Sequence, residues 1–178
     1  ECASMYHGAN RLGGNSLLAA IYSGHVAANA INTLAETKDC PNFETYISEQ
    51  EQVLEKRLQS KSRFSAVHVR HEIAKLLNDC LGITRTEEKL LEGIKSVDYY
   101  ISVSEKLIYD IDVSPYIGYS LQPMILLARA ILTSALSRKE TRGSHIREDY
   151  PQRSDEFALC SVCDYKNGEH HLSYIKED

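Results

Sequence analysis

The segment from His7 to Leu18 holds the residues best suited to chemistry, and it reads His-Gly-Ala-Asn-Arg-Leu-Gly-Gly-Asn-Ser-Leu-Leu. Glycines let a backbone approach a ligand closely and adopt unusual dihedral angles. A helix that follows such a turn offers free amides, and the positive end of its dipole, to an anion or an electron-rich ring. Arg11 could hold a carboxylate through a forked pair of hydrogen bonds. The alternative is a glycine-rich loop with a surface arginine.

Cysteine and histidine pairs elsewhere in the chain could suggest a metal or redox site. Cys160 and Cys163 have a metal-like spacing, but a strand there would place residues three apart on opposite faces. The histidines come in two close pairs, His68 with His71 and His170 with His171. Neither pair has an evident carboxylate or third histidine to complete a site. We therefore expect no metal site, structural cysteines, and solvent-exposed histidines.

The element that must position the glycine-rich segment is a helix over about residues 15–34. Its apolar residues follow helical spacing, and Asn15 or Ser16 is a good N-cap. Alanines and a glycine keep the sides of this helix thin. A helix of this kind normally packs closely against a larger element.

Residues 42–137 predict an antiparallel helical bundle with short connections. Apolar residues recur at three- and four-residue spacing in the first three segments, which predicts helices over 43–58, 67–82 and 90–107. Thr84 could open the third helix in a capping box with Glu87, and Thr86 is the alternative cap. Breaks at Ser114-Pro115 and Gly118 precede a final helix at about 122–137. Because that helix is almost continuously apolar, we expect it in the middle of the bundle.

The C-terminal part of the chain changes character. Residues 138–155 are strongly charged, and 157–174 alternate in short segments around Lys166-Asn167-Gly168. Asn-Gly between two strand-like runs indicates a β-hairpin. The predicted fold class is therefore mainly α, with a bundle of three or more helices and a small C-terminal β-hairpin.

Composition excludes several function classes. The chain has 178 residues and a net charge of -5, which argues against a nucleic-acid or anionic-lipid partner. No run approaches about 18 uninterrupted apolar residues, so a membrane span is not expected. Five cysteines, an odd number, fit a reducing compartment better than a disulfide framework. Because a dense motif follows almost directly on a first residue that is not Met, we interpret the sequence as a piece of a longer protein.

Two motifs resemble those of the succinate dehydrogenase/fumarate reductase flavoprotein family. Glu1-Cys2 together with the segment from His7 to Leu17 is similar to the C-terminal flavin-binding segment of that family. The later segment from Arg138 to Glu156, which begins Arg-Lys-Glu-Thr-Arg-Gly-Ser-His-Ile-Arg-Glu-Asp, resembles its second hallmark, Glu-Ser-Arg-Gly-Ala-His-x-Arg-x-Asp. The helical section lies between the two motifs, as it does in the family. The resemblance therefore spans essentially the whole chain.

The resemblance implies a division of the chain and a set of site residues. Residues 1–36 would be the end of an FAD-binding domain, 37–138 a helical bundle domain, and 139–178 a charged tail with short strands. Arg11 would bind a carboxylate of a dicarboxylate substrate, and Gly14 would lie beside that substrate. The residues implied to contact FAD are Glu1, Asn15, Ser16 and Leu17. No catalytic residue and no metal ligand is implied within this chain.

The implied activity is that of a longer enzyme, an FAD-dependent oxidoreductase that interconverts succinate and fumarate. The alternatives are L-aspartate oxidase, a relative that acts on another dicarboxylate, and a non-catalytic helical interaction module. The implied partner is an iron–sulfur electron-transfer subunit, and the implied place is the cytoplasm, at the membrane face where partner subunits hold it. The 178-residue chain alone would be inactive and would bind no FAD, and it could self-associate through the helix at 15–34.

The charged cluster of Arg142, His145 and Arg147 has two interpretations. It could bind the substrate or a partner subunit. The favoured interpretation is that these charges tie the tail to the absent flavin domain through acidic residues of the tail. The acidic residues considered for this role are Asp149, Asp155 and Glu156.

Overall fold

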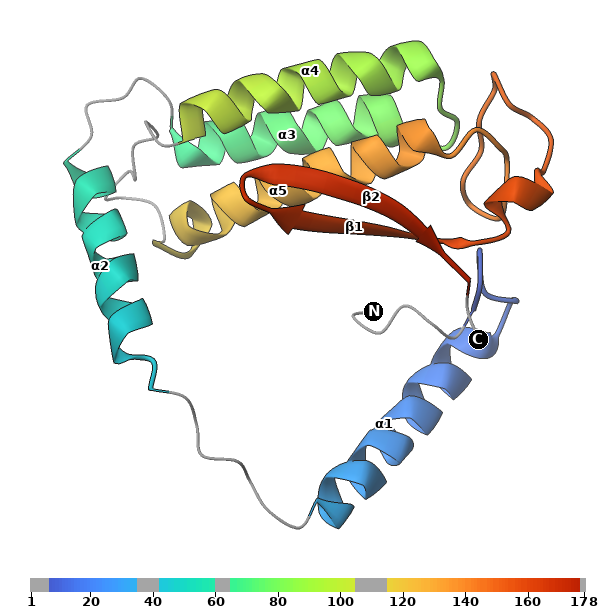
Figure 1. Ribbon diagram of the computed structural model, residues 1–178, viewed down its shortest axis with the longest axis horizontal. Coiled ribbons are helices and arrows are strands. Elements are labelled where there is room, and N and C mark those ends of the chain that lie inside the picture. Colours follow the sequence, from blue (N-terminus) through green and yellow to red (C-terminus); the bar gives the residue numbers. More distant parts are fainter. Residues whose placement is uncertain (1–6, 35–41, 60–64, 105–114, 177–178) are drawn as a thin grey trace. The chain divides into compact units, whose positions relative to one another are not determined.

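The structure, a computed structural model, describes residues 7–34, 42–59, 65–104 and 115–176 (Figure 1). The chain divides into two compact units, residues 1–47 and 48–178. Each unit is described by itself below. The three domain boundaries expected from the sequence stay predictions.

The first unit contains α1 (Asn15–Thr33), which confirms the helix predicted from the small and apolar residues. The predicted cap is wrong, because the N-cap is Gly14 and no side chain caps the helix. Gly14 has φ 83, in the left-handed region that only glycine enters easily. The tight turn that leads into α1 therefore depends on the backbone of Gly14 rather than on the side chains of Asn15 or Ser16. No residue of α1 is buried.

A helix named α2 (Glu44–Leu58) crosses the division between the two units and matches the amphipathic segment predicted there. The three helices that follow in the second unit are α3 (Ala66–Leu81), α4 (Glu87–Ser104) and α5 (Pro115–Ser137). They pack against one another in pairs, as Figure 1 shows for the green and yellow ribbons. A short turn at residues 82–86 makes α3 and α4 antiparallel neighbours. The mainly α fold with a helical bundle is thus confirmed.

The core of the bundle lies between these three helices. Gly93 on α4 is buried where α4 passes α3, and a Cβ there would lie 3.1 Å from the Cys80 sulfur. A larger residue at this position would force the neighbouring side chains to shift. The buried apolar side chains of this core are Ala66, Val69, Ile73, Cys80, Leu90, Val97, Leu121, Ile125, Ala128, Leu132 and Ala135.

The helix α5 starts earlier than the sequence predicts, at Pro115 instead of about Gln122. Gly118 was expected to break the helix but lies buried inside it. Proline is well suited to a first helical turn because the N–H that it lacks has no partner there. By length and composition alone, the stretch from Tyr116 to Ser137 is apolar enough to cross a membrane. The central helix of a bundle has the same composition, and the buried stripe of α5 packs on α3 and α4.

The tail ends in the predicted hairpin, formed by β1 (Cys160–Lys166) and β2 (Glu169–Ile175). The strands are antiparallel, and Lys166 pairs with Glu169 across a two-residue turn. Asn167 and Gly168 both have positive φ, 54 and 85, as the tight hairpin turn requires. Both strands contact α5, which gives the two-stranded sheet a surface on which to pack.

Candidate functional site

The turn before α1 carries the residues that the sequence singles out for ligand binding. The Asn10 side chain accepts a hydrogen bond from the Arg11 amide at 2.8 Å. The Asn15 amide donates to the Leu12 carbonyl at 3.2 Å, which closes the turn that leads into the helix. Arg11 and Gly14 are exposed. The turn is thus shaped by its own backbone and leaves the Arg11 side chain at the surface.

The residues that follow Asn15 at the start of α1 lie at the surface. Ser16 and Leu17 are exposed, and Leu17 keeps 75% of its surface accessible. Since no side chain caps α1, its N-terminus presents partial positive charge without a side-chain acceptor. A Cβ built on Gly14 would meet nothing within 4 Å, so the backbone faces open space there.

These observations leave the roles of the candidate residues as predictions. Arg11, Gly14, Ser16 and Leu17 lie together because they are close in sequence, and Asn15 is half-buried between them. Glu1 lies outside the described residues.

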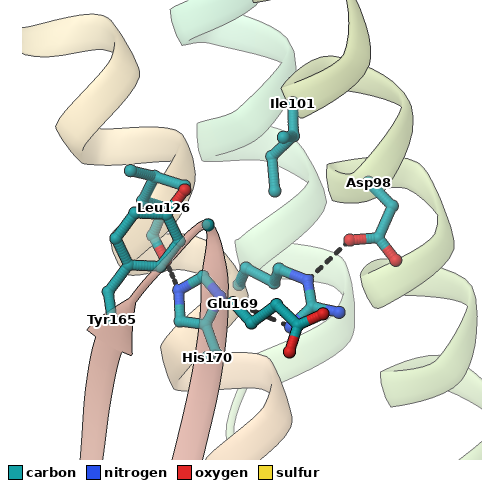
Figure 2. Close-up of a pocket in the computed structure, with 8 residues that line it drawn as sticks. Asp98, Ile101, Leu126, Tyr165, Glu169 and His170 are labelled. Carbon is teal, nitrogen blue, oxygen red and sulfur yellow. Dashed lines mark hydrogen bonds and ion pairs between the residues drawn. The ribbon is translucent and has the colours of Figure 1, made fainter.

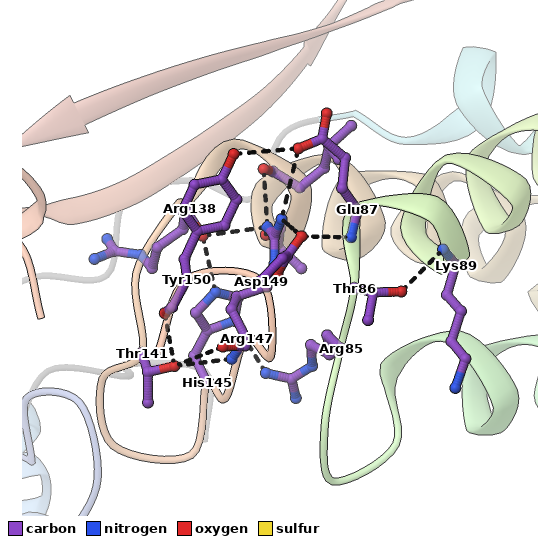
Figure 3. A network of polar contacts seen from close by, with 12 residues as sticks. Arg85, Thr86, Glu87, Lys89, Arg138, Thr141, His145, Arg147, Asp149 and Tyr150 are labelled. Carbon is purple, nitrogen blue, oxygen red and sulfur yellow. Dashed lines mark hydrogen bonds and ion pairs between the residues drawn. The ribbon is translucent and has the colours of Figure 1, made fainter. Parts of the chain in front are cut away.

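A network of charged groups surrounds the buried Arg147 in the second unit (Figure 3). Arg147 is 0% exposed. Its Nε and Nη2 donate to the two carboxylate oxygens of Asp149, each at 2.8 Å. Its Nη1 donates to the carbonyls of Ala135 at 2.9 Å and Leu136 at 3.1 Å, at the C-terminus of α5. This cation therefore caps α5 as well as pairing with a carboxylate.

Asp149 extends the network from Arg147 to the start of α4. Its Oδ2 accepts a hydrogen bond from the Glu87 amide at 2.8 Å, and the Thr86 hydroxyl accepts one from the Lys89 amide at 3.4 Å. The alternative cap Thr86 is thus the one that α4 uses. Hydrogen bonds from Arg147 hold the pKa of Asp149 at about 2, well below its ordinary value. The carboxylate is therefore ionised at neutral pH and stabilises the α4 N-terminus.

Glu140 is a second acid of the tail and, unlike the exposed Asp149, it is fully buried, with 0% exposure. Its Oε1 accepts from Arg138 at 2.7 Å and from Arg142 at 2.8 Å, and its Oε2 accepts from the Ser154 amide at 2.9 Å. Burial alone would raise the pKa of Glu140, but the hydrogen bonds from Arg142, Ser154 and Arg138 outweigh it and lower the pKa to about 2. The ion is fully satisfied, as a buried charge must be.

These contacts correct the favoured interpretation of the charged cluster. Arg142 and Arg147 bind acids and carbonyls of their own chain. Asp149 is one of the partners expected from the sequence, but Glu140 was missed. Two clues pointed to Glu140: it lies two residues before Arg142 and carries the opposite charge. The network holds the tail on the bundle.

A surface cavity of about 450 Å³ lies between α4, α5 and the hairpin turn (Figure 2). Arg129 pairs with Asp98 at 2.6 Å on one side of it. The His170 ring hydrogen-bonds to the Leu126 carbonyl at 2.9 Å, and its other nitrogen lies 3.4 Å from Arg129 Nη1. The expectation that His170 lacks partners is therefore wrong, because the hairpin folds this histidine onto α5. The polar groups of the cavity mainly bind one another.

The remaining cysteine and histidine predictions concern metal binding. His68, His71 and His171 are exposed, as expected. Cys160 and Cys163 both lie in β1, where a three-residue spacing places side chains on opposite faces. Within the described ranges, no group of three possible ligands gathers in a way that could hold a metal ion.

Comparisons with known proteins point to the same family as the two sequence motifs. Residues 70–177 match the family model described as fumarate reductase flavoprotein C-term. An uncharacterised FAD-dependent oxidoreductase of Methanocaldococcus jannaschii is 30% identical over 161 residues, 88% of this chain and 29% of that protein. The succinate dehydrogenase flavoprotein subunit of Bacillus subtilis is 28% identical over 172 residues, again 88% of this chain and 29% of the relative.

Solved structures share the fold. A quinol fumarate reductase of E. coli matches with a TM-score of 0.73 and 26% identity, over 96% of this chain and 31% of that one. An Sdh1 complex of Mycobacterium smegmatis reaches a TM-score of 0.80 at 22% identity, over 97% of this chain and 31% of that one. The chain spans about 30% of the length of these relatives. It belongs to the succinate dehydrogenase/fumarate reductase flavoprotein family, of which it covers the C-terminal region.

Proposed function

We propose that this chain is the C-terminal part of an FAD-dependent oxidoreductase that interconverts succinate and fumarate. The observation that carries the proposal is the uncapped, exposed N-terminus of α1 directly behind Arg11. The family membership and the names of the relatives support the flavin and the dicarboxylate.

Within this proposal, each residue of the turn has a physical task. FAD, when bound, supplies a ring that exchanges hydride with the substrate. The Ser16 and Leu17 amides would face the ring edge, where the positive end of the helix dipole favours negative charge. Gly14 would let the substrate approach the backbone, and Arg11 would bind one substrate carboxylate. Glu1 would contact the nucleotide, and Asn15 would support the turn.

The bundle and the tail would act as the scaffold of this site rather than as its chemistry. Arg142 and Arg147 use their donors on Glu140, Asp149 and nearby carbonyls. A further proposal concerns the assembly: the longer flavoprotein would pass electrons to an iron–sulfur subunit and lie peripherally at the cytoplasmic membrane face. The similarity to the quinol fumarate reductase of E. coli supports this proposal.

The test is Arg11→Lys in the longer flavoprotein. Lysine keeps the charge but loses the planar fork. A lost hydrogen bond to a charged group is worth about 1.5–3 kcal/mol, or roughly one to two decades in kcat/KM for fumarate. Flavin content should stay near that of the parent. Arg70→Lys is a matched control, since Arg70 is an exposed arginine on α3.

Three results would contradict the proposal. Unchanged kinetics with fumarate in the Arg11→Lys variant would remove Arg11 from the substrate site. Turnover of L-aspartate in place of succinate would identify an aspartate oxidase instead. An encoded start codon directly before Glu1 would favour a helical interaction module without catalytic activity.

A further inference from the structure

His145 lies at the centre of the contacts between the tail and the turn that joins α3 to α4. Its Nε2 is 3.0 Å from the Arg138 carbonyl, and its Nδ1 is 3.0 Å from Arg85 Nη1 (Figure 3). A carbonyl only accepts hydrogen bonds, and a guanidinium only donates them. The two contacts are therefore satisfied together only by a neutral ring that carries its proton on Nε2.

The surroundings of His145 disfavour a second proton. Burial lowers the pKa of His145 below its ordinary value of 6.5, and the positive charges of Arg85, Arg147 and Arg138 lower it further, against the opposing effect of the hydrogen bond to the Arg138 carbonyl. The acids of the network are engaged elsewhere, Glu140 with Arg138 and Arg142, and Asp149 with Arg147. A protonated ring would thus add a cation among arginines.

The same histidine belongs to a loop that lies along the α3–α4 turn, which we define as residues 141–149. The Arg85 amide donates to the Ile146 carbonyl at 2.9 Å, and the Glu148 amide donates to the Arg85 carbonyl at 3.0 Å. Arg85 itself is fixed to α3, because its Nε donates to the Leu81 carbonyl at 2.8 Å. The Arg85 side chain thereby connects α3, the turn and the histidine ring.

We propose that His145 is a proton-sensitive latch that holds the loop 141–149 on the α3–α4 turn. A proton on Nδ1 removes the acceptor that faces Arg85 and replaces it with a positive charge. The hydrogen bond to Arg85 then breaks, and the two backbone hydrogen bonds between Arg85 and the loop open more often. Arg147 keeps its bonds to Asp149 and to α5, so the opening is local.

Two NMR measurements on the 178-residue chain test the latch. Ring nitrogen shifts of His145 should show the Nε2–H tautomer at pH 7.5. The hydrogen-exchange rate of the Glu148 amide, divided by its intrinsic rate, measures how often the loop 141–149 opens. This opening should increase roughly tenfold per pH unit below about pH 6.5, where the His145 ring of the open loop takes a proton. The Leu90 amide, which bonds to the Thr86 carbonyl at the start of α4, is the internal reference.

His145→Gln is the matched variant, because its amide can donate to one group and accept from the other but does not titrate. Its Glu148 exchange should show no such pH dependence, whereas His68→Gln, at an exposed position on α3, should keep it. The latch is refuted by the Nδ1–H tautomer, or by corrected exchange that stays constant from pH 8 to pH 5 in the unsubstituted chain. Both of these readings hold even where His145→Gln does not fold.

Discussion

Arg147 and Asp149, two residues apart, are joined by two parallel hydrogen bonds of 2.8 Å between guanidinium and carboxylate. The pair bridges two helices, because Arg147 binds carbonyls at the end of α5 and Asp149 binds the Glu87 amide at the start of α4. One ion pair thus satisfies backbone groups that both helix ends leave open.

Arg147→Lys should destabilise the chain by about 2–4 kcal/mol, because lysine cannot form the paired bonds and the carbonyl bonds together. Urea unfolding followed by circular dichroism measures the change. Arg70→Lys, at an exposed position on α3, should stay within about 0.5 kcal/mol of the parent. Equal midpoints for the two variants would show that the network around the buried Arg147 adds little stability.

Gly93→Ala should destabilise the bundle by about 1–3 kcal/mol through overpacking. The new Cβ would lie 3.1 Å from both Cys80 Sγ and Leu132 Cδ2. Gly24→Ala is the control, since nothing lies within 4 Å of that position on α1, and alanine there should raise helicity. Thermal unfolding compares the two. A Gly93 variant as stable as the parent would mean that α3 and α4 can separate without cost.

The periodicity of the sequence predicted the helices well, and Asn167-Gly168 predicted the hairpin. The start of α5 was wrong because Pro115 and Gly118 were taken as breaks, although proline suits a first helical turn and tertiary packing accommodates Gly118. Local signals of this kind are ambiguous until the packing around them is known.

The candidate turn could be found from sequence because its residues are contiguous, from Arg11 to Leu17. The ion network around the buried Arg147 could not. Charged residues are mostly solvated, and the partners Arg85 and His145 lie 60 residues apart. Only the fold brings the α3–α4 turn to the tail and reveals that Arg147 is enclosed.

Acid should weaken the fold through Glu140. Its pKa is about 2 in the folded chain against an ordinary 4.5, so the unfolded chain binds a proton that the folded chain does not. The stabilisation, about 3 kcal/mol, is present above pH 4.5 and is lost as the pH falls toward 2. Urea midpoints between pH 2.5 and 6 measure it.

Glu140→Gln is the variant that separates this effect from general acid sensitivity. It should be less stable than the parent at pH 6, and its stability should depend less on pH in the same window. Identical slopes for both proteins would assign the acid sensitivity to other carboxylates.

The isolated 178-residue chain should bind FAD negligibly and reduce no fumarate. In the proposed site this turn would offer amides to only one edge of the ring, and so few contacts cannot offset the entropy of immobilising the ligand. Titration with FAD, followed by flavin fluorescence, measures binding. Saturable binding in the micromolar range would show that the site is more self-contained than proposed.

The C-terminal cap of α5 also bears on the order in which the chain folds. The Arg147 bond to Ala135 spans 12 residues, whereas the Arg85 bond to His145 spans 60. Closing the longer loop costs about 1.4 kcal/mol more in chain entropy. The contact between Arg147 and the end of α5 can therefore form early in folding, while the contact between the α3–α4 turn and the tail forms late. Substitutions at Arg147 should then mainly slow folding, and substitutions at Arg85 should mainly speed unfolding.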